Sequence, residues 1–102
     1  MPKRDAGASS DFRIFETEEF LKRLARFPRK ESDFLERKLQ EYTYPQLREN
    51  PFVGPNIKKL KGGYAPDTWR YRIGDIRVFF QVDRASRTVF ILTLDDRRDA
   101  YR

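Results

Sequence analysis

The sequence predicts an α+β domain in which a helical hairpin packs on a mostly antiparallel four-stranded sheet, in the order βααβββ. Two observations carry this prediction. Apolar residues recur at helical spacing in the first half of the chain, and they alternate with polar residues in the second half. The 102 residues are enough for a single compact domain. We expect this domain to cover residues 11–102, after a flexible polar tail over residues 1–10.

The first half predicts one short strand followed by two amphipathic helices. Residues 12–16 are rich in strand formers, and Thr17 stands where a helix-capping residue is preferred. Pro28 separates the two helices, and the second runs from about residue 30 to residue 42. The expected apolar stripes are Phe20, Leu21, Leu24 and Phe27 in the first helix and Phe34, Leu35, Leu39 and Tyr42 in the second.

The second half predicts three strands joined by tight turns. Prolines and glycines first break regular structure after residue 42, apart from a short helical turn over residues 46–49. Residues 69–73 and 76–82 then alternate apolar and polar side chains around a glycine-containing turn, which is typical of a hairpin. After a second turn, residues 88–94 form a strand of β-branched and aromatic residues.

The composition excludes several kinds of site. The chain has no Cys and no His, which removes disulfides, thiol nucleophiles, imidazole bases and the zinc sites built from those ligands. Its longest apolar run, residues 89–92, is far shorter than the roughly 18 apolar residues that span a bilayer. We therefore expect a cytoplasmic protein without a membrane partner, whose chemistry relies on carboxylates, Lys, Arg, Tyr, Ser or Thr.

Positive charge is concentrated in the second half of the chain. The net charge of the chain is +6. Residues 57–102 carry 11 basic and 6 acidic side chains, whereas residues 1–56 carry 11 basic and 10 acidic side chains. A localised basic surface favours an anionic partner, which is either a nucleic acid or an acidic protein segment.

Alternation in the predicted hairpin gathers three arginines on one face of the sheet. The apolar residues of strand 69–73 are expected in the core, which leaves Arg70 and Arg72 on the opposite side. Arg77 joins them because the apolar positions of the neighbouring strand also face the core. Such arginines either receive an anion or line a solvated face, and the charge pattern alone leaves both interpretations open.

Three segments are the basis of a family resemblance. They are Asn50-Pro-Phe-Val-Gly-Pro-Asn-Ile-Lys-Lys-Leu-Lys-Gly62, Trp69-Arg-Tyr-Arg-Ile-Gly-Asp-Ile-Arg-Val78 and Asp96-Arg-Arg-Asp-Ala-Tyr101. In this order and spacing they resemble the signatures of the RelE family of bacterial and archaeal toxins. The resemblance implies a RelE-like fold and a small basic toxin that enters the ribosomal A site and cleaves mRNA there. It also implies neutralisation by a cognate acidic antitoxin, and we expect the free toxin to be a monomer.

The resemblance implies roles for individual residues. Arg70 and Arg72 match the two basic strand positions of the family's active site, and Arg77 matches the arginine that grips the scissile phosphate. Arg97 matches the C-terminal catalytic arginine, and Tyr101 matches the tyrosine that stacks on or orients the substrate nucleotide. The residues expected to contact RNA outside the catalytic set are Lys58, Lys59, Lys61 and Arg98.

These residue types suit RNA cleavage without a metal or a cofactor. The ribose 2′-OH attacks its own phosphate, and guanidiniums stabilise the extra negative charge of the pentacoordinate species. Relatives with Lys at the Arg70 and Arg72 positions have a candidate general base there, whereas arginine holds its proton too tightly. The base is therefore open, and the candidates are Asp95, Asp96, Tyr101 and a group of the ribosome.

Three other interpretations remain open. A ParE-like toxin shares the fold, binds DNA gyrase and has no nuclease activity. A metal-dependent nuclease would hold Mg²⁺ on Asp95, Asp96 and Asp99, although Arg97 and Arg98 offer these acids ordinary salt bridges. An inactive relative would only bind the antitoxin.

Overall fold

The structure is a computed structural model, and it describes residues 11–61 and 67–96. In chain order its elements are β1 (Arg13–Glu16), α2 (Glu18–Ala25), α3 (Arg29–Lys38), the π-helical turn η1 (Leu39–Thr43), α4 (Tyr44–Glu49), β2 (Ile57–Lys59), β3 (Thr68–Ile73), β4 (Ile76–Asp83) and β5 (Thr88–Asp96). The expected tail over residues 1–10 lies outside the described residues. Within the described part of the chain, no helix is long and apolar enough to cross a membrane.

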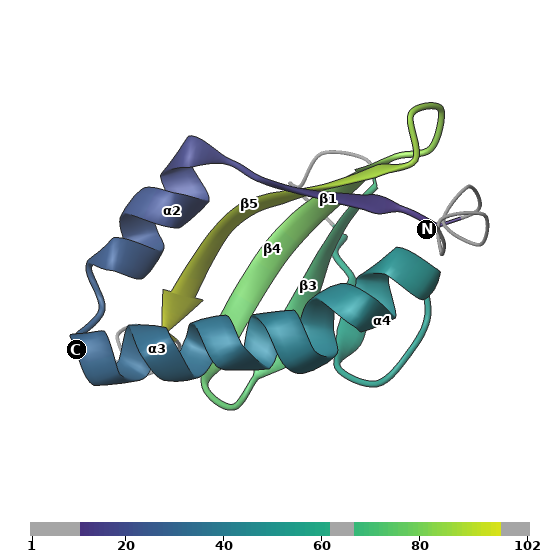
Figure 1. The fold of residues 1–102 in the computed structure, drawn as a ribbon. Helices are drawn as coiled ribbons and strands as arrows, with labels where there is room; N and C mark the ends of the chain where they lie inside the picture. Colours follow the sequence, from purple (N-terminus) through teal and green to yellow (C-terminus); the bar gives the residue numbers. More distant parts are fainter. Residues whose placement is uncertain (1–10, 62–66, 97–102) are drawn as a thin grey trace, which may run out of the picture.

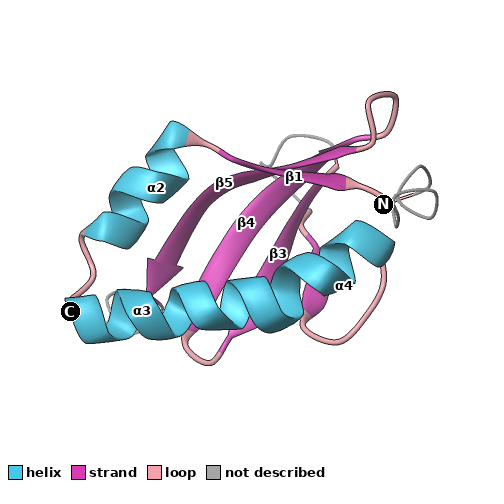
Figure 2. Ribbon diagram, in the orientation of Figure 1, coloured by secondary structure: helices cyan, strands magenta, loops and turns pink. Residues whose placement is uncertain are grey.

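The strands form one mixed sheet in the order β1-β5-β4-β3-β2. β1 runs parallel to β5, and the other neighbouring pairs are antiparallel. Figure 1 shows α3 and α4 crossing in front of the strands, with α2 beside the end of β5. The same layering of helices (cyan) over strands (magenta) is visible in Figure 2. The expected α+β architecture is therefore confirmed, but the sheet has five strands rather than four.

The additional strand is β2, a three-residue edge strand that pairs with β3. It was missed because three residues are too few to show the alternation that identifies a strand. The turn before it depends on Gly54, whose φ of 146° is unfavourable for other residues and whose missing side chain would collide with Gln46. Pairing of β2 with β3 brings Lys58 beside Arg70.

The core lies between the helices and the inner face of the sheet. The alternation predicted for the hairpin is confirmed, because Trp69, Tyr71, Ile76, Val78, Phe80 and Val82 are all buried. The helical segments contribute Phe20, Leu24, Leu35, Leu39, Tyr44 and Leu47 to the same apolar cluster. Leu21, which was expected in the first stripe, is exposed instead.

The π-helical turn η1 changes which residues of the second helix face the core. A π turn holds more residues than an α turn, so the residues that follow it are rotated about the helix axis. As a consequence Thr43 and Tyr44 are buried, whereas Tyr42 is exposed. The expected stripe is therefore wrong at Tyr42. It is also wrong at Phe34, which lies about 100° round the helix from the buried Leu35.

Two helices begin where the sequence predicts, at Thr17 and Pro28, whereas Pro45 does not break the helical structure as expected. Thr17 caps α2, because its Oγ1 accepts a hydrogen bond from the Phe20 amide at 3.3 Å and donates to the Ile91 carbonyl at 2.8 Å. Pro28 precedes α3 and occupies its N-cap position. Pro45 does not break the helical segment, because it lies in the first turn of α4, where a missing amide proton costs little.

A β-bulge interrupts the pairing of β4 with β5. The register shifts between Phe79 and Phe80, whose partners are Thr93 and Ile91, so Leu92 is the extra residue. This shift leaves Leu92 and Thr93 as two consecutive half-buried residues between the buried Ile91 and Leu94 of β5. It also places Thr93 on the same face of the sheet as Phe79.

Tyr44 joins α4 to β1 through its phenol. The hydroxyl donates a hydrogen bond to Oε2 of Glu16 at 2.6 Å. Burial raises the pKa of the Tyr44 phenol, and the contact with Glu16 raises it further because it opposes a second negative charge. The hydroxyl therefore stays protonated and remains a donor throughout the physiological pH range.

Candidate functional site

The face of the sheet opposite the helices carries Lys58, Arg70, Arg72 and Arg77, which we call the basic cluster. Neighbouring residues on β3 and β4 are buried in the core, so these side chains point to the other face, which we call the open face. The register places Lys58 directly opposite Arg70 and Arg72 directly opposite Arg77. The structure thus brings together the three arginines that alternation had grouped.

Backbone oxygens hold two of the arginines. Nη1 of Arg70 donates to the Asn56 carbonyl at 3.1 Å, and Nε of Arg72 donates to the Gly74 carbonyl at 3.4 Å. Neither arginine has a carboxylate partner within residues 11–61 and 67–96. Like charges directly opposite each other in a sheet repel, so the placement of Arg72 opposite Arg77 has a cost in stability.

Arg77 is fixed by a two-point contact with Asp95, its cross-strand partner on β5. Nε and Nη2 of Arg77 each donate to one carboxylate oxygen of Asp95 at 3.1 Å. About a third of each side chain remains exposed, 37% for Arg77 and 36% for Asp95. The contact orients the guanidinium, and it occupies both oxygens of Asp95. Asp95 therefore bonds to Arg77, where the sequence had suggested Arg97 or Arg98 as its partner.

The predicted RNA-binding lysines do not share one face. Lys58 belongs to the basic cluster, whereas Lys59 points to the other side of β2. There the Lys59 ammonium lies 3.9 Å from Asp67 and 5.3 Å from the centre of the Trp69 ring. Lys61 is exposed beyond the end of β2. The segment that sequence similarity treated as one basic patch is divided by the alternation of the strand.

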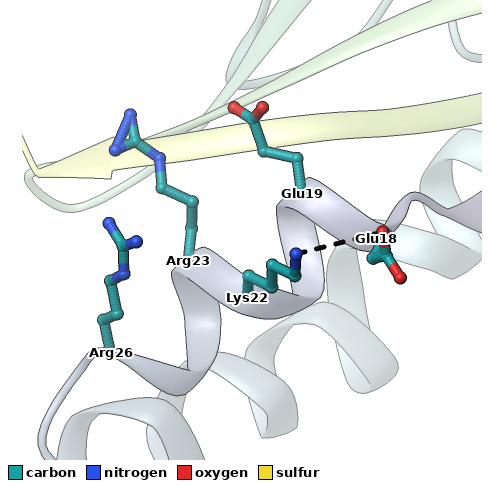
Figure 3. Close-up of a pocket in the computed structure, with 5 residues that line it drawn as sticks. All are labelled: Glu18, Glu19, Lys22, Arg23 and Arg26. Carbon is teal, nitrogen blue, oxygen red and sulfur yellow. Dashed lines mark ion pairs between the residues drawn. The ribbon is translucent and has the colours of Figure 1, made fainter.

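Sequence reasoning missed Arg23 on α2, which reaches the open face. Its Nε donates to Oγ1 of Thr93 at 3.1 Å, and Thr93 lies opposite Phe79 on that face. Figure 3 shows the Arg23 side chain extending from α2 toward β5, on the same side of the helix as Glu19 and Arg26. No local sequence pattern signals this contact, because it depends on how α2 packs beside β5.

Aromatic side chains adjoin the basic cluster on the open face. Phe15 of β1 pairs with Phe90 of β5, and their ring centres are 5.6 Å apart in an edge-to-face arrangement. Phe79 lies directly opposite Arg70, and the Arg77 guanidinium is 5.7 Å from the centre of its ring. Cations interleaved with half-exposed rings are typical of surfaces that bind single-stranded nucleic acid, where rings stack on bases and cations contact phosphates.

The C-terminal part of the expected site lies outside the described residues. This applies to Arg97, Arg98, Asp99 and Tyr101. Asp95 and Asp96 are consecutive in β5, so they point to opposite faces of the sheet. Within the described residues, no group of three or more acidic side chains is arranged to hold a metal ion.

A comparison with known protein families identifies the family to which this fold belongs. Residues 16–101 match the family described as the ParE toxin of type II toxin-antitoxin system, parDE. The chain belongs to this family. It is a toxin of a type II toxin–antitoxin system, within the superfamily that joins RelE and ParE toxins. No match was found among curated protein sequences.

Solved structures from the same superfamily share the fold of this ParE-family toxin. The RelBE2 toxin–antitoxin complex from Mycobacterium tuberculosis has a chain with 23% identity and a TM-score of 0.67, covering 85% of this chain and 99% of that one. The archaeal RelE–RelB complex from Pyrococcus horikoshii has a chain with 26% identity and a TM-score of 0.61. The match covers 84% of this chain and 94% of that one. The YoeB/ParE toxin from Agrobacterium tumefaciens has 17% identity and a TM-score of 0.67. The match covers 83% of this chain and 98% of that one.

Proposed function

We propose that this ParE-family toxin is a ribosome-dependent endonuclease that cleaves mRNA in the ribosomal A site. The basic cluster is the observation that carries the proposal. It gathers four cations from three neighbouring strands on one face, and its two β3 arginines, Arg70 and Arg72, are held by backbone oxygens. A sheet that concentrates like charge in this way is arranged to receive a polyanion.

The chemistry proposed for the cluster needs no metal or cofactor. The 2′-oxygen of the ribose attacks the neighbouring phosphorus, the bond to the 5′-oxygen of the next nucleotide breaks, and a cyclic phosphate remains. Charge on the phosphoryl oxygens increases in the transition state, and fixed guanidiniums stabilise it there more than in the ground state. In this proposal Arg70, Arg72 and Arg77 supply that stabilisation.

Arg77 can contact a phosphate without leaving Asp95. A guanidinium has five N–H donors, and the contact with Asp95 uses one on Nε and one on Nη2. The remaining donors are available to a phosphoryl oxygen. Asp95 therefore serves in this proposal to orient Arg77, which makes Asp95 a positioning residue rather than the general base.

The general base has fewer candidates than the sequence left open. Both oxygens of Asp95 accept hydrogen bonds from Arg77. Asp96 lies opposite Ile76, a core residue, and so on the side of the sheet away from the basic cluster. We therefore assign proton removal to Tyr101 or to a group of the ribosome, and we keep Arg97 as a further transition-state contact and Arg98 as an RNA contact.

The partner proteins of similar structures support an antitoxin for this chain. The complexes from Mycobacterium tuberculosis and Pyrococcus horikoshii each pair a toxin with an antitoxin. We propose that this toxin likewise has a cognate antitoxin, and that the antitoxin is acidic because the toxin has a net charge of +6.

The matching family supports a second candidate function. Its description names ParE toxins, and a ParE-like protein would inhibit DNA gyrase without cleaving RNA. The two functions make different demands on the basic cluster. A nuclease needs the fixed geometry of the Arg77 guanidinium, whereas a gyrase-binding surface needs only a complementary shape and charge.

Cleavage of mRNA on purified ribosomes tests the proposal. Wild-type protein is expected to cut ribosome-bound mRNA, and Arg77→Ala is expected to slow cutting about 100-fold or more, as loss of one transition-state donor does. Arg77→Lys keeps the charge but loses the two-point geometry, so it is expected to be impaired as well. Arg29→Ala is the matched control, because Arg29 lies at the start of α3 and is largely exposed.

Two outcomes decide between the candidate functions. Intact messages together with blocked DNA supercoiling by wild-type protein would assign the chain to gyrase inhibition and remove the catalytic roles of the arginines and Tyr101. If cleavage occurs, Tyr101→Phe tests whether the phenol hydroxyl moves the proton, and Asp96→Asn is expected to have no effect on the rate.

A further inference from the structure

The chain between α4 and β2 ends in a tight turn over residues 54–57, which we call the Asn56 turn. In Figure 1 the chain that leaves α4 curves back, in teal, toward the side of the sheet formed by β3. The Ile57 amide closes the turn by donating to the Gly54 carbonyl at 3.2 Å. Asn56 has a φ of 71°, in the left-handed region that few residues with a side chain adopt. Such a conformation persists where the surrounding structure holds it.

One carbonyl of this turn serves two arginines of the basic cluster. The Asn56 carbonyl accepts a hydrogen bond from the backbone amide of Arg72 at 3.0 Å. It also accepts one from Nη1 of Arg70 at 3.1 Å. A carbonyl oxygen has two lone pairs, so these two bonds use its capacity. The direction of this carbonyl therefore sets where the Arg70 guanidinium lies relative to β3.

Gln46 of α4 holds the peptide unit that leads into Asn56. Nε2 of Gln46 donates to the Pro55 carbonyl at 3.0 Å. That carbonyl and the Asn56 amide belong to the same planar peptide unit. The next carbonyl is bonded to the amide of Arg72, so the peptide planes on both sides of the Asn56 Cα are held. Asn56 cannot leave its left-handed conformation unless one of these contacts breaks.

The Gln46 amide is itself fixed by the core. The hydroxyl of Tyr71, a residue that is 4% exposed, donates to Oε1 of Gln46 at 3.0 Å. Tyr71 requires the oxygen of the amide and the Pro55 carbonyl requires its nitrogen, so the two partners set its orientation. The turn also packs closely on this amide, because a Cβ atom on Gly54 would lie 2.5 Å from Nε2.

We propose that Gln46 is a positioning residue, which holds the Arg70 guanidinium in place through the Asn56 turn. The contacts run from the Tyr71 phenol through the Gln46 amide to the turn, and from the Asn56 carbonyl to Arg70. For catalysis, this role rests on the proposed nuclease function. Gln46 acts on the reaction only through the geometry of Arg70.

The neutral support of Arg70 differs from the charged support of Arg77. Asp95 orients Arg77 and cancels much of its charge, whereas the Asn56 carbonyl orients Arg70 without adding a negative charge. The bond to Asn56 uses one of the five N–H donors of the Arg70 guanidinium. Arg70 therefore keeps its full charge and four donors for a phosphate, provided that the turn keeps its shape.

Cleavage kinetics on purified ribosomes test this role with Gln46→Met. Methionine is about as long as glutamine but cannot donate a hydrogen bond, so the tether to Pro55 is lost. We expect kcat to fall about tenfold, because a small misplacement of a catalytic group slows the chemical step. KM is expected to stay within about twofold, because the charge of Arg70 remains. The matched control is Gln40→Met, since Gln40 is an exposed glutamine of η1.

A double-mutant cycle separates positioning from a merely structural role. If Gln46 acts through Arg70, Gln46→Met is expected to slow cleavage no further in a protein that already carries Arg70→Ala. A structural role would slow both backgrounds by the same factor, and that result would overturn the proposal. An unchanged kcat for Gln46→Met alone would overturn it as well. Urea unfolding identifies conditions under which every variant is fully folded, and the rates are compared there.

Hydrogen exchange tests the support of the turn without any cleavage assay. In Gln46→Met, exchange of the Arg72 amide relative to that of Val78, in the middle of β4, is expected to be at least about tenfold faster. Dividing by the Val78 rate removes any change in global stability. An unchanged ratio would refute the positioning role whatever the activity. If wild-type protein cuts no mRNA, the nuclease proposal fails, while this ratio still decides whether Gln46 holds the Asn56 turn.

Discussion

The two faces of the same sheet are built from alternate residues and have opposite properties. On β3, the buried side chains of Trp69 and Tyr71 are only 3% and 4% exposed. The alternating residues Arg70 and Arg72 lie on the open face. The inner face is packed with apolar side chains from the helices. Because neighbouring positions on one strand can differ so much, a single strand contributes both to stability and to a binding surface.

The difference between the faces shows where stability has been given up. On the inner face, Trp69 stacks on Phe80 with ring centres 6.0 Å apart, and apolar burial favours the folded state. On the open face, Arg72 stands opposite Arg77, and the ion pair of Arg77 with Asp95 offsets part of the repulsion. Like charges are kept side by side at a cost in stability, which is typical of functional surfaces.

Neighbouring substitutions on β3 give the largest test of this contrast. Trp69→Ala removes a buried ring and is expected to lower the free energy of unfolding by roughly 3 to 5 kcal/mol. Arg70→Ala, one residue later on the open face, is expected to change it by less than about 1 kcal/mol. Urea unfolding of both variants measures these values. Equal losses would mean that the assignment of the two faces is wrong.

The salt dependence of RNA binding tests the open face as a whole. If the four cations of the basic cluster each neutralise a phosphate, the affinity for a single-stranded RNA should fall roughly 50-fold between 50 and 200 mM salt, because counterions are released. Titrations at several salt concentrations measure the salt slope, which is the slope of the logarithm of the affinity against the logarithm of the salt concentration. The double variant Arg70→Gln/Arg72→Gln should reduce this slope by about 1.4, and a flat dependence in the wild type would contradict a phosphate-binding face.

The sequence was sufficient for the contrast between the faces because alternation is a local property. Period-two spacing, with one lapse at Phe79, identified both the buried residues of β3 and β4 and the three arginines on the opposite face. Thr17 and Pro28 marked helix starts for equally local reasons. Each of these signals depends on residues close together in the chain, so a single sequence reveals them.

The features that the sequence did not reveal depend on contacts between distant segments. The contact of Arg77 with Asp95 needs the β4–β5 register, which includes a bulge. The contact of Arg23 with Thr93 needs the packing of α2 beside β5. The π turn was also missed, because the spacing of apolar residues was interpreted as a regular α-helix up to Tyr42.

Thr43 offers a smaller test on the inner side of the molecule. Its buried hydroxyl has no partner in the described structure, and Thr43→Val keeps the shape while removing the unpaired polar atom. The substitution is expected to raise the free energy of unfolding by about 1 kcal/mol, since a buried unsatisfied group is costly. Thermal or urea unfolding measures the change. A clear loss of stability would show that the hydroxyl has a partner in solution.

Arg23 tests how far the open face extends, because it reaches this face from a helix rather than from a strand. Nε of Arg23 is bonded to Thr93, which leaves the donors on Nη1 and Nη2 for a phosphate beside the basic cluster. Arg23→Gln is therefore expected to weaken binding of single-stranded RNA about threefold near 0.2 M salt and to reduce the salt slope by about 0.7. Lys22→Gln removes the same charge from the neighbouring position, where Figure 3 shows the ammonium directed toward Glu18, and it is expected to leave both quantities unchanged. If the two variants lose affinity equally, RNA responds to the overall charge of α2, and the open face ends at β5.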